Sequence, residues 1–337
     1  MLQKNNAANG IVPAERLGSV SEYYFSRKLK EVAKMNAEGK NVISLAIGSP
    51  DMPPSKATVD ELCRVAQLPE AHGYQPTMGT PELRKAMSQW YKRWFDVDLN
   101  PDNEIQPLIG SKEGILHVTL AFVNPGDKVL VPNPGYPTYT SLSKLLGAQV
   151  VNYNLRPEND WQPDFEELES MDLSGVKLLW SNYPNMPTGA NARRETYEKL
   201  VDFAKRHNIV VVNDNPYSFI LNNHPISLLQ VSGAKDCCIE FNSMSKSHNM
   251  PGWRVGLAAS NSQFIQWILK VKSNIDSGTF RAIQLAAAKA YDNDEQWHHA
   301  ANIDTYSRRR VYAENNASHE LRIRKDTSGN VSLGQDS

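Results

Sequence analysis

The chain has 337 residues, 36 Lys and Arg against 37 Asp and Glu, and 40% hydrophobic residues. Its length allows two domains and a sizeable core. The net charge of −1 excludes the overall positive field of nucleic-acid and membrane-surface binders. Apolar runs are too short to span a bilayer, and three cysteines do not suffice for a disulfide framework or a zinc site. The first residues lack the apolar stretch of a signal peptide, so we expect a soluble, cytoplasmic protein.

The N-terminal part predicts a lead-in followed by short elements. Residues 1–18 indicate an irregular segment. Residues 19–22 (Ser-Val-Ser-Glu) have the pattern of a capping box, and the apolar residues at helical spacing that follow predict a helix that stops at Gly39. A short apolar strand is expected over residues 42–47. Proline at the first helical position predicts a further helix from Thr80 to about Phe95.

From residue 105 onward, helices and strands alternate. Short, nearly continuous apolar strands between helices indicate an α/β fold, with a mostly parallel central sheet and helices on both faces. Ligands of such sheets bind beyond the carboxyl ends of the strands, so we look for functional residues there. The predicted strands cover 128–131, 176–181, 209–213 and 237–242, and the predicted helices cover 112–123, 195–207 and residues from about 262.

The strongest motif follows strand 237–242. Ser243, Ser245 and Lys246 precede Arg254, which lies between Gly252 and Gly256. Two hydroxyls and a guanidinium suit a phosphate group, and Arg is the better bidentate partner. A neighbouring cation lowers the pKa of a lysine amine, so Lys246 can act as a nucleophile.

A carboxylate ends the preceding strand. Asp214 begins the sequence Asp-Asn-Pro-Tyr, which includes Tyr217 and lies some thirty residues before Lys246. A carboxylate in this place can pair with the nitrogen of a pyridinium ring and keep it protonated, so that the ring accepts electrons. Taken alone, the same residues are a common turn signal.

Three further turns follow predicted strands. Gly110-Ser111-Lys112 opens a helix whose N-terminal N–H groups can bind an anion, although a serine there is often only a cap. Tyr136 lies in a proline-rich turn after strand 128–131, where it could also simply pack. Residues 182–189 read Asn-Tyr-Pro-Asn-Met-Pro-Thr-Gly.

Together these motifs resemble those of the class I and II aminotransferases, the fold-type I enzymes that use pyridoxal 5′-phosphate. The likeness covers roughly residues 20–312 and implies the fold-type I large domain. It implies that Lys246 forms the aldimine with the cofactor and moves the substrate proton, that Asp214 holds the ring nitrogen, and that Tyr217 donates to the phenolate oxygen. The implied phosphate ligands are Ser111, Lys112, Ser243, Ser245 and Arg254, and Tyr136 would stack on the ring.

The resemblance extends to two N-terminal positions and departs at one. It implies that the Gly48 N–H meets the substrate carboxylate and that Tyr74 reaches the phosphate in the neighbouring subunit of a homodimer. Met186 stands where the family usually has the Asn that bonds the phenolate oxygen, and methionine cannot donate that bond. Either Asn185 or Asn182 replaces it, or Tyr217 is the remaining donor.

The C-terminal part predicts an incomplete small domain. We expect residues 1–50 to be a lead-in and a piece of the small domain, 51–295 the cofactor-binding domain, 296–315 the start of the C-terminal small domain, and 316–337 an irregular tail. The tail lacks the family's carboxylate-binding arginine motif and is either native or out of frame. We therefore expect that this chain binds the cofactor weakly or folds poorly, and that its transaminase activity is much reduced.

The expected activity is amino-group transfer between an amino acid and a 2-oxo acid. The alternatives are a pyridoxal-phosphate-dependent lyase or synthase, because the same carbanion serves all these reactions, or an inactive remnant that keeps the fold. The overall likeness is nearest to the aspartate and LL-diaminopimelate aminotransferase branch.

Overall fold

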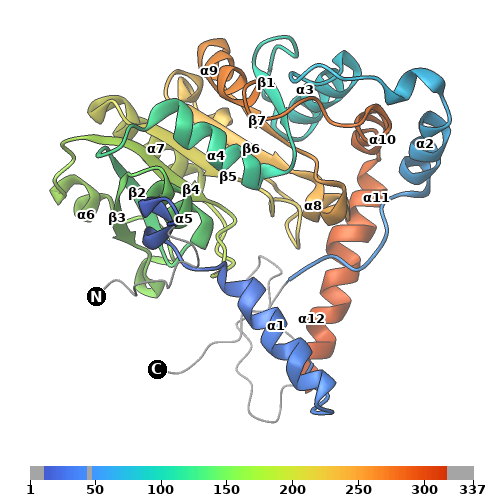
Figure 1. The fold of residues 1–337 in the computed structure, drawn as a ribbon, viewed down its shortest axis with the longest axis horizontal. Helices are drawn as coiled ribbons and strands as arrows, with labels where there is room; N and C mark the ends of the chain where they lie inside the picture. Colours follow the sequence, from blue (N-terminus) through green and yellow to red (C-terminus); the bar gives the residue numbers. More distant parts are fainter. Residues whose placement is uncertain (1–10, 44–47, 317–337) are drawn as a thin grey trace.

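The computed structural model describes residues 11–43 and 48–316. Their centre is a seven-stranded sheet in the order β1-β7-β6-β5-β4-β2-β3 (Figure 1). β7 is antiparallel to both of its neighbours, and the other pairs are parallel. The predicted α/β fold with a mostly parallel sheet is therefore confirmed. The strands are β1 (Ile105–Leu108), β2 (Lys128–Asn133), β3 (Gln149–Asn154), β4 (Val176–Asn182), β5 (Val210–Asp214), β6 (Cys238–Ser243) and β7 (Gly256–Ala259).

Helices cover both faces of the sheet. On one face, α4 (Ser111–Phe122), α5 (Pro137–Leu145) and α9 (Ser262–Lys272) bury apolar side chains against Val212, Ile239 and Phe241. On the other, α3 (Pro81–Phe95), α7 (Arg194–His207) and α10 (Arg281–Tyr291) pack on Val211 and Cys238. Consecutive strand residues thus point to opposite cores, which explains why these strands read as continuous apolar runs. The other helices of this body are α2 (Lys56–Ala66), α6 (Phe165–Ser170), α8 (Met244–Ser247) and α11 (Glu295–His299).

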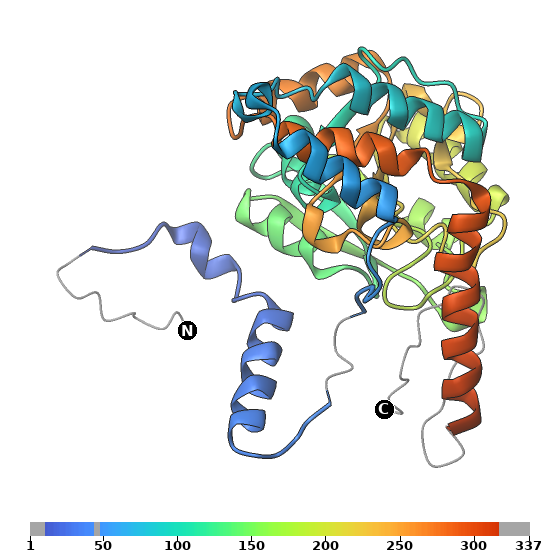
Figure 2. The same cartoon turned by 90° about the vertical axis from the view of Figure 1, so that its right-hand side faces the viewer.

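Two helices extend away from this body. α1 (Tyr24–Ala37) has no buried residue and stands apart from the sheet, and α12 (Thr305–Asn316) continues from a π-helical turn at Ala300–Asp304 (Figure 2). Among the described residues, no helix is both long and apolar enough to cross a membrane. The predicted division of the chain into domains stays a prediction.

The capping box predicted at residues 19–22 is wrong. Glu15–Ser19 form a 3₁₀ turn, and the helix begins only at Tyr24. Ser19 donates to the Arg16 carbonyl instead, and Glu22 pairs with Lys30. At the start of the helix, the ring centre of Tyr23 lies 3.9 Å from the Lys112 ammonium.

The other predicted elements match the structure closely except near residue 42, whereas the strands β1, β3 and β7 were not predicted. The predicted helix at residues 80–95 is present as α3, with the Thr80 side chain as its cap. Val42 and Ile43 are irregular, with Ile43 85% exposed, so the strand predicted there does not begin at 42. Residues 44–47, and the tail from 317 onward, lie outside the described residues.

Candidate functional site

The predicted site residues meet at one edge of the sheet because four strand ends coincide there. β4, β5 and β6 are parallel, and Asn182 pairs in register with Asp214. β7 runs the other way, so that its first residue, Gly256, lies opposite Ser243 at the end of β6 and Leu108 at the end of β1. The chain therefore returns to this same edge just before β7, which brings Arg254 to the carboxyl ends of the parallel strands.

Asp214 is 4% exposed at the end of β5. Its Oδ2 accepts a hydrogen bond from the Tyr139 hydroxyl at 2.9 Å, whereas Oδ1 is buried with no hydrogen-bond partner among the described residues. Burial raises the pKa of Asp214 to about 6, although Tyr139 and the nearby Ser111 oppose this shift. An unsatisfied buried carboxylate oxygen is costly, so Oδ1 is suited to a donor that the protein does not supply.

Lys246 lies on α8, the short helix that follows β6. Its Nζ donates to the Gly48 carbonyl at 2.7 Å and lies 5.8 Å from the centre of the Tyr217 ring. Burial and then the positive charge of Arg254 lower the pKa of Lys246, which increases the fraction of uncharged amine. Burial also raises the pKa of Tyr217, so its hydroxyl stays protonated as a donor.

Arg254 joins the serine cluster to the start of α4. Its Nη1 lies 3.5 Å from the Ser245 hydroxyl, and its Nη2 lies 3.5 Å from the Ile109 carbonyl. The Ser243 hydroxyl lies 3.0 Å from that of Ser245. At Gly110 an added Cβ would approach Arg254 Nη2 to 2.0 Å, so only glycine leaves room for the guanidinium beside the helix N-terminus.

Tyr136, Asn182 and Asn185 lie at the same edge of the sheet, beyond the carboxyl ends of the parallel strands. Tyr136 is half-buried, packs edge-on against Tyr139 at 5.6 Å, and has its hydroxyl 3.4 Å from that of Tyr23. Asn182 donates to the Asp214 carbonyl at 2.7 Å and accepts from the Met186 N–H at 2.8 Å, so its amide is used for structure. Asn185 is fully buried, and its Nδ2 has no hydrogen-bond partner among the described residues.

Two predicted positions differ from the others. Tyr74 is 97% exposed and therefore does not join the buried part of this site. Gly48 does reach the site, but it contacts Lys246 through its carbonyl oxygen, whereas the prediction concerns its N–H.

Comparison with known proteins agrees with this arrangement. Residues 40–329 match the protein family described as aminotransferase class I and II. The chain belongs to this family. Its members use pyridoxal 5′-phosphate, so the prediction of an aminotransferase that moves amino groups between amino acids and 2-oxo acids with this cofactor is confirmed.

The aminotransferase relatives are substantially similar over most of the chain. The LL-diaminopimelate aminotransferase of Dehalococcoides mccartyi (strain ATCC BAA-2100) is 46% identical over 299 residues, which is 88% of this chain and 77% of that protein. The corresponding protein of Aquifex aeolicus is 44% identical over 285 residues, covering 84% of this chain and 74% of that protein. The apo structure of BacF from Bacillus subtilis superposes with a TM-score of 0.89 at 34% identity, covering 95% of this chain and 81% of that one.

The site residues of this aminotransferase fit pyridoxal phosphate at both ends. The unpartnered Oδ1 of Asp214 is a complementary acceptor for a protonated ring nitrogen. At the other end, the N-terminal N–H groups of α4 and the Arg254 guanidinium are donors suited to a phosphate. Gly110 has no side chain, so it leaves room for the guanidinium beside these N–H groups.

The sequence prediction missed Tyr139 and Glu113. Tyr139 supplies the hydrogen bond to Asp214, and it lies one helical turn after Tyr136, so helical spacing was the available signal. Glu113 bonds the backbone N–H of Ile109 in the turn before α4. A glutamate three residues after a helix cap is a known signal for such a contact, although here the cap itself is a glycine.

Proposed function

We propose that this chain transfers the amino group of LL-diaminopimelate, with Lys246 as the reacting amine. The observation that carries the proposal is the position of the Lys246 amine, which lies beside Arg254 and Tyr217 at the edge of the sheet where Asp214 ends β5. The substrate is proposed from the names of the relatives, which are 41–46% identical to the chain. Those names favour amino transfer over a lyase or synthase reaction.

Different side chains of the site would hold different parts of the cofactor. Pyridoxal phosphate, when bound, supplies an aldehyde that reacts with amines and a ring that accepts electrons. Asp214 would hold a proton at the ring nitrogen, and Arg254, Ser243, Ser245 and the N–H groups of Ser111 and Lys112 would hold the phosphate. Tyr217 and Asn185 would donate to the phenolate oxygen, and Tyr136 would cover the ring.

Lys246 would carry the substrate proton. Burial and the Arg254 charge lower the pKa of its amine, which increases the fraction of uncharged amine that can react and accept a proton. Its contact with the Gly48 carbonyl shows that Nζ reaches as far as the N-terminal loop. The substrate carboxylate would then bind at that loop, as proposed for the Gly48 N–H.

The test is chemical trapping at Lys246. The protein is incubated with pyridoxal phosphate, reduced with borohydride, digested and analysed by mass spectrometry. We expect the cofactor mass on the peptide that contains Lys246 and none on Lys246→Ala, whose transaminase rate should fall by roughly 10²–10⁴-fold. Label on a different lysine would contradict the assignment.

Substrate choice needs a separate measurement. LL-diaminopimelate and aspartate are offered as amino donors in single-turnover reactions, and absorbance reports conversion of the cofactor to its amine form. We expect faster conversion with LL-diaminopimelate, and a faster reaction with aspartate would contradict the proposed substrate. A homodimer in which Tyr74 serves the neighbouring site is also proposed, and the cytoplasmic location stays a prediction.

A further inference from the structure

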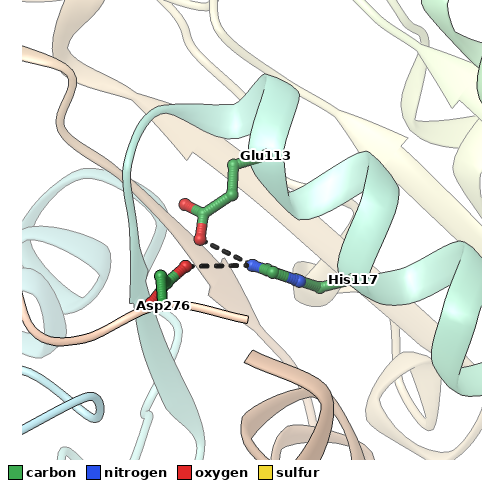
Figure 3. A group of neighbouring side chains, drawn as sticks. All are labelled: Glu113, His117 and Asp276. Atoms are coloured by element: carbon green, nitrogen blue, oxygen red, sulfur yellow. Dashed lines mark hydrogen bonds and ion pairs between the residues drawn. The ribbon is translucent and has the colours of Figure 1, made fainter. Parts of the chain in front are cut away.

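Four charged or titratable side chains form a network behind the turn that precedes α4. Figure 3 shows three of them, with Glu113 and His117 on α4 and Asp276 facing them from the segment after α9. His117 Nε2 lies 2.6 Å from Glu113 Oε1, and Lys272 Nζ lies 2.5 Å from the same oxygen. Lys272 Nζ also contacts the two Asp276 oxygens at 2.7 and 2.8 Å. Lys272 is 3% exposed and His117 is fully buried, so the network is largely shielded from solvent.

A metal ion is not needed to explain this cluster. Ligand atoms of Glu113, His117 and Asp276 lie within 4.8 Å of one another, a spacing that could hold a cation. The Lys272 ammonium, however, already bonds both carboxylates and supplies the positive charge there. We therefore interpret the cluster as an ion-pair network.

The second carboxylate oxygen of Glu113 contacts the turn that precedes α4. Glu113 Oε2 accepts a hydrogen bond from the Ile109 N–H, and the Ile109 carbonyl lies 3.5 Å from Arg254 Nη2. The helix cap that follows is Gly110, which has no side chain to bond the first N–H groups of α4. Glu113 thus holds the turn from within the helix, at the place where the free N–H groups begin.

Charge balance explains why Glu113 has partners. A carboxylate in the first helical turn would repel a phosphate bound at the same N-terminus. Burial alone would raise the pKa of Glu113, but side-chain hydrogen bonds within the network and the positive charge of Lys272 outweigh it and lower this pKa to about 2, so Glu113 is ionised at neutral pH. The Lys272 ammonium compensates its charge locally.

We propose that Glu113, held by Lys272, His117 and Asp276, is a positioning residue that fixes the Ile109–Ser111 turn in the shape that binds the cofactor phosphate. This proposal rests on the proposed phosphate role of Ser111, Lys112 and Arg254. It predicts that the network acts on the phosphate end of the cofactor and not on its ring.

The test compares two ligands that differ only in the phosphate. Pyridoxal phosphate and pyridoxal are titrated by absorbance into the full-length wild-type chain and into Glu113→Gln, which keeps the size of the side chain but removes its charge. We expect affinity for pyridoxal phosphate to fall roughly tenfold, equivalent to about 1.4 kcal/mol. Affinity for pyridoxal should stay within about twofold, because pyridoxal makes no phosphate contact.

Two further variants distinguish an effect on the position of the turn from a general loss of folding. Glu198→Gln changes a solvent-facing glutamate on α7 and should alter neither affinity. Asp276→Asn changes a residue outside α4 that pairs with Lys272 and lies 3.6 Å from His117 Nε2. If Glu113→Gln does not fold, this variant should show the same selective loss, but a smaller one.

The outcomes distinguish this proposal from the proposed function. An equal loss for both ligands, or no loss for either, would overturn the positioning role. A wild-type chain that binds the two ligands equally well would instead refute the phosphate site itself.

Discussion

At the scale of the residue, Asp214 shows a conflict between stability and function. Its folded-state pKa is about 6, well above the ordinary value of 3.8. Between these two pH values the folded protein keeps a proton that the unfolded chain has lost, so stability falls as pH rises through this window. Above pH 6 the full cost of burying the charge applies to the cofactor-free protein.

We therefore expect Asp214→Asn to stabilise the cofactor-free protein at pH 8 by about 2–3 kcal/mol, because a pKa change of one unit corresponds to 1.36 kcal/mol. Below pH 4 the substitution should change the free energy of unfolding little. Urea unfolding at both pH values measures the difference. The same substitution should abolish most transaminase activity, because the amide cannot hold a proton at the ring nitrogen by charge.

Asp172→Asn is a control of opposite sign. Hydrogen bonds from Lys128 and Ser174 lower the pKa of this exposed carboxyl. Its replacement should therefore destabilise the protein at pH 8, and this loss should shrink as the pH falls below 4 toward the lowered pKa of the folded state. If Asp214→Asn changes stability equally at the two pH values, the burial argument for Asp214 fails.

At the scale of the element, an aromatic cluster holds the lysine-bearing helix in place. Trp90 on α3 lies 4.9 Å, between ring centres, from Phe219, His248 and His298. His248 follows the end of α8, and His298 belongs to α11. The cluster therefore joins α3 and α11 to the segment that carries Lys246.

Removing the central ring should loosen this junction. Trp90 is 1% exposed, so we expect Trp90→Ala to lower the free energy of unfolding by about 3–5 kcal/mol. Trp267→Ala on α9 is the matched control, because that side chain is 42% exposed, and we expect about 1 kcal/mol or less. Similar losses in the two variants, measured by urea unfolding, would contradict the role of the cluster.

Local sequence signals predicted elements well where they agreed with tertiary packing. Thr80 and Pro81 start α3 as expected, and the apolar runs of β2, β4, β5 and β6 lie within about two residues of their predicted bounds. The short strand β7 (Gly-Leu-Ala-Ala) was missed because its residues have weak strand propensity and it is held by pairing with β1 and β6.

The site was predictable only in part, for a similar reason. Lys246, Asp214 and Arg254 follow or precede strands within recognisable motifs, so the sheet topology brings them together. Tyr139, which bonds Asp214, and Lys272, which bonds Glu113, lie on helices. No local sequence pattern specifies how these helices pack against the strands and against each other. The i,i+4 pairs on α4 and at the end of α9 were visible, but their contact with each other depends on the fold.

At the scale of the whole molecule, the exposure of Tyr74 fits a site shared between subunits. Within one chain its side chain is 97% exposed, although the turn that carries it lies just before α3. A side chain so exposed is free to enter a neighbouring subunit, although a single exposed apolar residue does not by itself indicate an interface. The proposed homodimer would place Tyr74 at the phosphate of the other subunit.

Mixed dimers test this arrangement directly. Lys246→Ala and Tyr74→Ala should each be weakly active alone. After equal mixing, unfolding and refolding together, about a quarter of wild-type activity should return, because half of the dimers are mixed and each has one complete site. Refolding each variant alone is the control, and no recovery on mixing would exclude a shared site.

The antiparallel direction of β7 also determines where insertions in the sequence affect the site. Because β7 enters the sheet at the rim where β6 leaves it, the connection from Ser243 to Gly256 never crosses to the far side. This one short β6–β7 connection thus contains both Lys246 and Arg254. Insertions elsewhere in the chain leave the number of residues between Lys246 and Arg254 unchanged, whereas an insertion between these two residues alters the spacing of amine and guanidinium.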